Sequence, residues 1–155
     1  MIMEIYDIAV KCLFAAVPAV GFAVAFNVPA KYLKFCAVGG AFGYLIRELL
    51  MGYGVQIPLS TFLASVMVSF YAVIWAQKSM AHPRVISVAS IIPMIPGVYA
   101  YKTMIAVVEL ADRGYDMNMM QSAVENGLKT FFILGAIAFG LAIPGLIIYR
   151  GKPVV

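Results

Sequence analysis

Charged side chains are scarce in this sequence, and their scarcity excludes most soluble folds. Asp, Glu, Lys and Arg make up 12% of the 155 residues, whereas hydrophobic residues make up 64%. Soluble domains usually carry about 25% charged residues. A spanning helix needs about 20 apolar residues, so the chain has room for several spans with short loops and for no soluble catalytic domain. We therefore expect an all-α integral membrane protein.

Histidine and cysteine are also rare, which limits the chemistry that the chain can perform. His82 is the only histidine, and Cys12 and Cys36 are the two cysteines, both in apolar surroundings without CxxC spacing. We expect the cysteines to be small buried packing residues. Metal clusters, hydrolase motifs and phosphate-binding loops are missing, so we expect no metal site, no cofactor and no enzymatic activity. The net charge of +4 is distributed by loop and predicts no nucleic-acid partner.

Apolar runs predict five spans in a single membrane domain that covers residues 1–155. We place these spans at about 5–26, 32–51, 59–77, 85–108 and 121–149. Glu4 and Asp7 precede the first basic residue, Lys11, so we expect the first span to be retained and not cleaved as a signal peptide. Gly39 and Gly43 in the second span have the spacing that lets helices approach closely.

Basic residues in the loops predict the orientation of the chain. With five spans, one side receives six of them: Lys31, Lys34, Lys78, Arg84, Arg150 and Lys152. The opposite loops receive Arg113 alone. Lysine and arginine accumulate on the cytoplasmic side, so we predict the N-terminus outside and the C-terminus inside. A four-span alternative leaves the second segment out of the membrane, but it separates Lys78 and Arg84 from the earlier lysines.

The fourth span is interrupted where a spanning helix should be most regular. Pro93, Pro96 and Gly97 fall within the apolar run 85–108, roughly 12 to 18 Å from its start at ~1.5 Å per residue. Each proline removes an N–H donor and crowds the carbonyl four residues back. Broken helices at the bilayer midplane offer carbonyls to a cation and N–H groups to a carboxylate. The interruption therefore predicts a transport site, although proline kinks also serve packing alone.

Five ionisable residues are predicted to lie in the outer third of the spans: Arg47, Glu48, Lys102, Glu125 and Lys129. Such residues are costly in a membrane and are candidates for function, with snorkelling to the interface as the alternative. Arg47 is a candidate charge partner for a substrate. Glu125 and Lys129 have the i, i+4 order that favours an ion pair. A proton relay through Glu125 is the competing interpretation.

Three further polar residues are candidates at the ends of spans. His82 precedes Pro83 at the mouth of the interrupted span and has a titration range suited to proton coupling or gating; a turn residue without other function is the alternative. Asn27 fits a turn before Pro29. Asn126 lies further into a helix and is expected to face a partner group.

Several of these motifs together resemble the small subunit of the split threonine/serine exporter family. The resemblance rests on residues 18–23 and 26–29, on Ala81-His82-Pro83, on the doublet around Pro93 and Pro96 with Ala100-Tyr101, and on Ile143-Pro144-Gly145. It covers nearly the whole chain, and the proline doublet is its most specific part. The family pattern also includes Arg47, Asn27 and Asn126, whereas Glu48, Lys102, Glu125 and Lys129 do not match it.

The resemblance implies a subunit of an exporter in the bacterial inner membrane. Single-chain members of the family join two membrane halves, and this chain resembles the short half, which works with a larger membrane subunit. The family implies efflux of threonine and serine, or of succinate-like dicarboxylates, driven by the proton-motive force. The implied pathway residues in this sequence are Pro93, Pro96, Gly97, Arg47, Asn27, Tyr101 and Asn126.

We therefore predict a subunit of a secondary-active exporter of small carboxylate-bearing metabolites, with His82 and Glu125 as candidate groups for proton coupling or gating. A five-span unit without an internal repeat is expected to need a second subunit or a second copy of itself. A noncatalytic assembly subunit and a stand-alone channel remain the alternatives. The sequence leaves open the solute, the coupling ion, the stoichiometry and the subunit that holds the main binding site.

Overall fold

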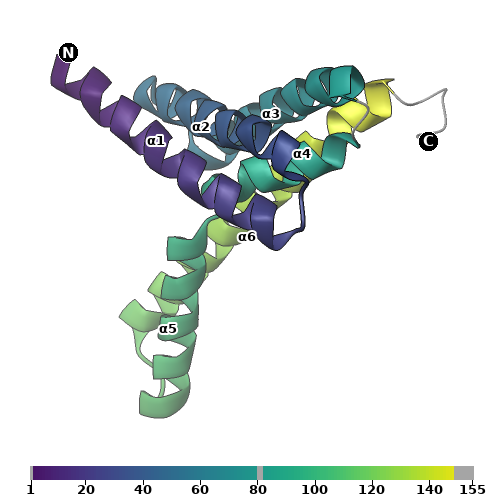
Figure 1. Cartoon of the computed structure of the whole chain (residues 1–155). Coiled ribbons are helices and arrows are strands. Elements are labelled where there is room, and N and C mark those ends of the chain that lie inside the picture. The colour runs from purple at the N-terminus through teal and green to yellow at the C-terminus, as the bar shows by residue number, and fades with distance from the viewer. Residues whose placement is uncertain (1, 80–81, 149–155) are drawn as a thin grey trace. The chain divides into compact units, whose positions relative to one another are not determined.

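The computed structural model describes residues 2–79 and 82–148. These residues form six α-helices and one 3₁₀ helix: α1 Ile2–Ala25, α2 Ala30–Gly52, α3 Ile57–Ser79, α4 Pro83–Ile91, η1 Ile92–Met94, α5 Gly97–Arg113 and α6 Met117–Ile148 (Figure 1). The helices agree with the predicted spans to within a few residues at each end. Arg150 and Lys152, two of the predicted cytoplasmic basic residues, lie outside the described residues.

Four of these helices are long and apolar enough to cross a membrane: α1 from Tyr6, α2, α3 to Lys78, and α6. The α4–α5 pair passes the same test only when its two parts are taken together, as a broken span or a re-entrant loop. The described part of the chain therefore holds four or five spans. The four candidates include α2, the segment that the four-span alternative left outside the membrane.

The helix ends follow from local sequence chemistry. After α1, Asn27 adopts a left-handed conformation with φ of 55°. The Asn27 N–H donates to the Val24 carbonyl, and the Val28 N–H donates to the Ala23 carbonyl. These two hydrogen bonds define a Schellman motif. Gly54, with φ of 83°, ends α2 in the same way. The predicted turn at Asn27 is confirmed.

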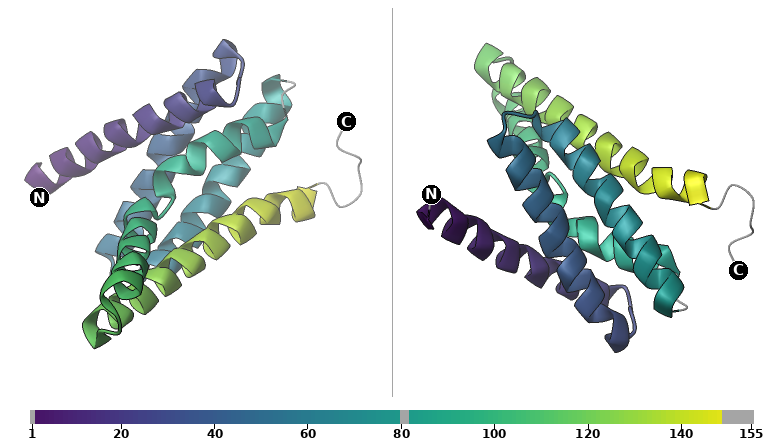
Figure 2. Two further views of the ribbon diagram at one scale, coloured as in Figure 1. Left: turned by 90° about the horizontal axis from the view of Figure 1, so that it is seen from below. Right: turned by 90° about the horizontal axis from the view of Figure 1, so that it is seen from above.

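The chain divides into two compact units. The first comprises Met1–Met94 and Ala136–Val155, and the second comprises Ile95–Gly135. The first unit therefore holds α1 to α4, η1 and the C-terminal part of α6. In the second unit, α5 and the first part of α6 form an antiparallel hairpin (Figures 1 and 2). The prediction of one membrane domain stays a prediction.

Close packing in the first unit depends on glycines of α2. A Cβ on Gly40 would lie 2.6 Å from Ala19 Cβ of α1, and a Cβ on Gly43 would lie 2.6 Å from Val68 Cγ2 of α3. A Cβ on Gly39 would overlap Ser90 of α4. The predicted close approach at Gly39 and Gly43 is confirmed, and α2 contacts three neighbouring helices through this glycine surface.

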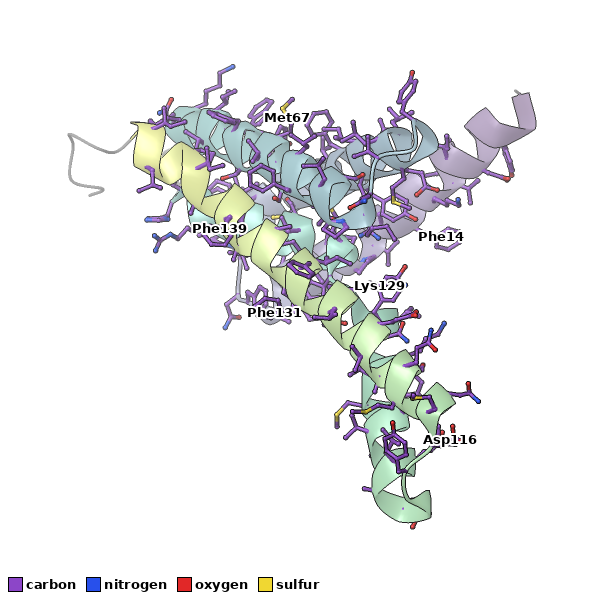
Figure 3. All side chains as sticks on the ribbon, turned by 180° about the vertical axis from the view of Figure 1, so that it is seen from behind. Phe14, Met67, Asp116, Lys129, Phe131 and Phe139 are labelled. Carbon is purple, nitrogen blue, oxygen red and sulfur yellow. The ribbon has the colours of Figure 1, made fainter. Side chains whose placement is uncertain are left out.

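Large apolar side chains cover the outer surface, as expected in lipid. Phe14 of α1 is 72% exposed, and Phe139 of α6 is 73% exposed. Figure 3 shows both side chains, with Met67 and Phe131, standing clear of their ribbons. Apolar side chains that face outward in such numbers belong in a bilayer and would be a liability in water.

Candidate functional site

The predicted interruption of the fourth span is present, and its prolines produce it. Because Pro93 has no N–H, the Ala89 carbonyl accepts from Ile92 instead, one residue earlier than in an α-helix. The chain then passes through η1. Pro96 caps α5, and the Gly97 N–H donates to the Ile95 carbonyl at 2.8 Å. Backbone groups are thus released from helical pairing between residues 92 and 97.

Arg47 of α2 binds one of the carbonyl groups at this break. Its Nη1 donates to the carbonyl oxygen of Met94 at 3.0 Å, and the Arg47 side chain is half-buried. The Met94 side chain is fully buried, and a Cβ on Gly43 would lie 3.1 Å from its Cε. Arg47 therefore stabilises the end of η1. A substrate carboxylate would have to share the guanidinium with this carbonyl.

Glu48, the next residue of α2, has a different partner. Its Oε1 accepts a hydrogen bond from Lys11 Nζ of α1 at 2.6 Å. Neighbouring helical positions point about 100° apart, which explains why Arg47 and Glu48 serve different helices. The ion pair joins α1 to α2, and pairing reduces the cost of two charges in candidate membrane spans.

His82 caps the N-terminus of α4, directly before Pro83 at the first helical position. Its Nδ1 accepts a long hydrogen bond of 3.4 Å from the Arg84 N–H. With Nδ1 as the acceptor, the neutral imidazole carries its proton on Nε2. This capping contact fits the alternative of a histidine that serves the turn before α4. Its proposed role in gating stays a prediction.

A cavity of about 460 Å³ opens at this end of the first unit. It lies between α3, α4 and the C-terminal part of α6, whose ends come together in Figure 1. Its polar lining consists of Ser69, His82, Arg84 and Ser87, and the rest is apolar or glycine. No acidic side chain of the described residues lines it, so the cavity is basic.

A second hollow of about 310 Å³ also borders Arg84. It is lined by the turn between α1 and α2, including Asn27, and by Val85 and Val88 of α4. Arg84 borders both hollows. The structure thus brings Asn27 and His82 to the same end of the first unit, and the predicted five-span topology also places both turns on one side.

The remaining predicted residues lie in the second unit. Tyr101 is 67% exposed. Asn126 Nδ2 donates to the Ser122 carbonyl at 2.8 Å within its own helix, so the described residues give it a local partner and no partner on another helix. A third hollow of about 290 Å³ lies between α5 and α6, where Lys102 and Glu109 face Ser122.

The predicted ion pair between Glu125 and Lys129 is wrong. Glu125 Oε1 accepts from Gln121 Nε2 at 2.9 Å, on the preceding turn of α6. Lys129 Nζ lies 5.9 Å from the ring centroid of Tyr99 on α5. Both side chains are exposed, and each contacts another residue instead: Glu125 contacts Gln121, and Lys129 lies over the ring of Tyr99. Spacing alone could not reveal either competitor.

Sequence reasoning missed three lining residues of the main cavity. Arg84 was used only as a marker of orientation, and Ser69 and Ser87 were not considered. A signal was present, because Thr61, Ser65 and Ser69 recur every four residues and so share one face of α3. All three are buried, and Ser69 donates to the Leu141 carbonyl of α6 at 3.3 Å.

The described residues contain no group of three His, Cys, Asp or Glu side chains that could hold a metal ion.

Long apolar helices, an interrupted helix and outward-facing aromatic side chains define the class: a multi-pass helical membrane protein. Residues 11–147 match the family model described as threonine/serine exporter, ThrE. The chain belongs to the threonine/serine exporter family.

One relative shows how this chain compares in length. An uncharacterised protein of Haemophilus influenzae is 47% identical over 155 residues, which is 100% of this chain and 51% of the relative. The chain thus spans about half the length of the curated relative that it matches. No solved structure matches it.

Proposed function

We propose that this chain is one half of a secondary-active exporter of small carboxylate-bearing metabolites, and that a second, larger membrane subunit supplies the other half. The observation that carries the proposal is the family match over residues 11–147. The H. influenzae relative supports the two-part organisation, because it contains a further region about as long as the matched one. Transporters are often assembled from two related halves.

Two features of the chain support transport as the function. The span through α4 and α5 is interrupted, and irregular backbone at membrane depth is tolerated where it is buried in protein or lines a wet cavity. Lys31, Lys34, Lys78 and Arg84 cluster at the predicted cytoplasmic end, where they attract anions. An exporter collects its solute from that side, so a basic entrance suits a carboxylate.

The solute, the energy source and the location are part of the proposal. The solute is threonine, serine or a succinate-like dicarboxylate, and the proton-motive force of the bacterial inner membrane drives its efflux. His82 and Glu125 are the proposed groups for coupling or gating. His82 lines the main cavity, and Glu125 is exposed on α6 in the second unit.

Counterflow in vesicles tests the proposal. Vesicles with this chain, with the larger subunit, or with both are loaded with threonine, serine or succinate, and uptake of the same labelled solute is followed. We expect exchange only when both chains are present. Leak with this chain alone would support a channel instead, and absence of exchange for every solute would refute the exporter. A pH gradient across the same vesicles tests coupling: Glu125→Gln and His82→Gln should lose gradient-driven flux, and Glu125→Gln should keep exchange at equal pH.

Proline variants distinguish a pathway subunit from an assembly subunit. Replacing Pro93 and Pro96 with alanine restores two N–H donors at the break. We expect the complex to form and the exchange rate to fall. Pro58→Ala in the first turn of α3 is the control, because proline there replaces no needed helical donor. If the double variant loses assembly in step with exchange, the chain acts as a scaffold and not as part of the pathway.

A further inference from the structure

We propose that the cavity between α3, α4 and the C-terminal part of α6 is a carboxylate-binding site, with Arg84 as its anchoring residue. The inference rests on the proposed exporter function for the class of solute. The cavity holds about 460 Å³, within the range of roughly 300–1,000 Å³ that is usual for small-molecule sites. All of its lining residues belong to the first unit.

Arg84 supplies the chemistry that a carboxylate requires. A guanidinium group is planar and presents paired N–H donors that match the two oxygens of a carboxylate. In the part of the chain that the structure describes, the hydrogen bond at Arg84 is made by its backbone N–H, and the ion pair present joins Lys11 to Glu48. The guanidinium is thus available to a ligand, unlike that of Arg47, which binds the Met94 carbonyl.

The other polar groups of the cavity suit an anionic solute that also carries a hydroxyl or ammonium group. His82 offers Nε2–H as a second donor, since its Nδ1 accepts from Arg84 N–H. Ser69 and Ser87 are each 5% exposed, and the Ser69 hydroxyl donates to the Leu141 carbonyl. Hydroxyl oxygens of this kind can accept from a hydroxyl or ammonium group of the solute. Since no acidic side chain of the described residues lines the cavity, it favours anions over cations.

Gly145 leaves part of the cavity open, and substitution at this position tests whether that volume is needed for binding. It lines the cavity, and a Cβ built on it would meet no atom within 4 Å. A larger side chain at this position therefore extends into open space and does not collide with the packed helices. Gly145→Leu should narrow the cavity without changing its charge. Arg84→Gln should remove the charge and leave the space unchanged.

The experiment measures equilibrium binding and counterflow with the exporter complex in phosphatidylcholine bilayers, with labelled succinate and labelled threonine as probes. We expect Arg84→Gln to weaken binding roughly 10- to 100-fold, the effect of losing charged hydrogen bonds. Arg84→Lys should have an affinity between that of the unchanged complex and that of Arg84→Gln, because lysine keeps the charge and loses the paired donors. Gly145→Leu should also weaken binding. Lys129→Gln is the control, because it removes an exposed cation of α6 that lies outside the cavity lining.

The outcomes separate the site from the exporter function. If Arg84→Gln and Gly145→Leu bind and exchange both solutes like the unchanged complex, the site assignment is wrong and the exporter function stands. If the unchanged complex neither binds nor exchanges either solute, the proposed function fails as well. If phosphatidylglycerol added to the bilayer binds in a way that depends on Arg84 and neither solute does, the cavity is a lipid headgroup site and the inference is overturned. Matching thermal midpoints for all variants exclude misfolding as the cause.

Discussion

Adjacent charges on α2 show how single residues are accommodated at membrane depth. Arg47 binds the Met94 carbonyl of the broken helix, and Glu48 pairs with Lys11 of α1. Insertion of an isolated charge near a helix centre costs about 2.5–3.5 kcal/mol, and a partner offsets part of that cost. Both residues were expected to be either functional or interfacial. Their contacts make each of them a structural link between helices, whatever further role Arg47 has.

Removal of the Arg47 guanidinium should destabilise the end of η1, at the break between α4 and α5. We expect Arg47→Met to lower stability by about 1–3 kcal/mol, because the Met94 carbonyl loses a charged hydrogen bond. Arg47→Lys should be milder, since an ammonium group can still donate. The midpoint of thermal unfolding of the purified protein in detergent measures the effect. Lys102→Met is the control, because Lys102 is an exposed cation on α5 without a hydrogen bond or ion pair in the described residues. Equal midpoints for Arg47→Met and the control would contradict the proposed link.

At the scale of elements, α2 is the helix against which the first unit is assembled. Its glycines contact α1, α3 and α4, and the contacts leave no room for a methyl group. The role of Gly40 was not predicted, because only the four-residue spacing of Gly39 and Gly43 was considered. Gly40 lies on the side that faces Ala15 and Ala19, so α1 and α2 approach through small residues on both helices.

Alanine substitution should distinguish the packed glycine from an open one. Gly40→Ala places a Cβ 2.6 Å from Ala19 Cβ and 3.3 Å from the Ala15 carbonyl oxygen. We expect a loss of about 1–3 kcal/mol, as for other overpacked sites, and lower accumulation in the membrane. Gly21→Ala on α1 meets nothing within 4 Å, so it should be neutral or stabilise the helix by up to about 1 kcal/mol. Similar thermal midpoints for the two variants would show that the α1–α2 contact is not tight.

Elements could be predicted from the sequence more completely than sites. Apolar run lengths and the residues Pro93, Pro96 and Asn27 determine helices and their ends locally, so spans, break and turn were anticipated. The main cavity combines Ser69, Arg84 and Gly145, which come from three distant parts of the chain. No local pattern reveals that convergence. The predicted position of Arg47 within a span made it a candidate for function. Its partner is the backbone carbonyl of Met94, and a backbone contact cannot be predicted from the type of the residue that supplies it.

At the scale of the whole molecule, basic and aromatic side chains gather at one predicted membrane boundary. Lys31 lies 4.7 Å from the ring centroid of Tyr32, Lys34 lies 5.2 Å from that of Phe35, and Lys78 lies 5.3 Å from that of Trp75. Phe35 and Trp75 also stack, with centroids 4.6 Å apart. Aromatic rings and basic residues are both enriched at membrane interfaces, and an excess of lysine and arginine marks the cytoplasmic side. The orientation itself stays a prediction from the loop charges.

Cysteine accessibility tests this orientation directly. The background is Cys12→Ala with Cys36→Ala, which removes both native thiols. Asp116→Cys lies in the turn between α5 and α6, and Lys34→Cys lies near the start of α2. With the N-terminus outside, a membrane-impermeant maleimide should label Asp116→Cys in intact spheroplasts and Lys34→Cys only after lysis. The reverse pattern would invert the orientation and place the basic cavity around Arg84 on the outer side, where an exporter would release its solute. Equal labelling of both positions in intact spheroplasts would indicate two opposite orientations in one membrane, against the one-sided distribution of the loop charges.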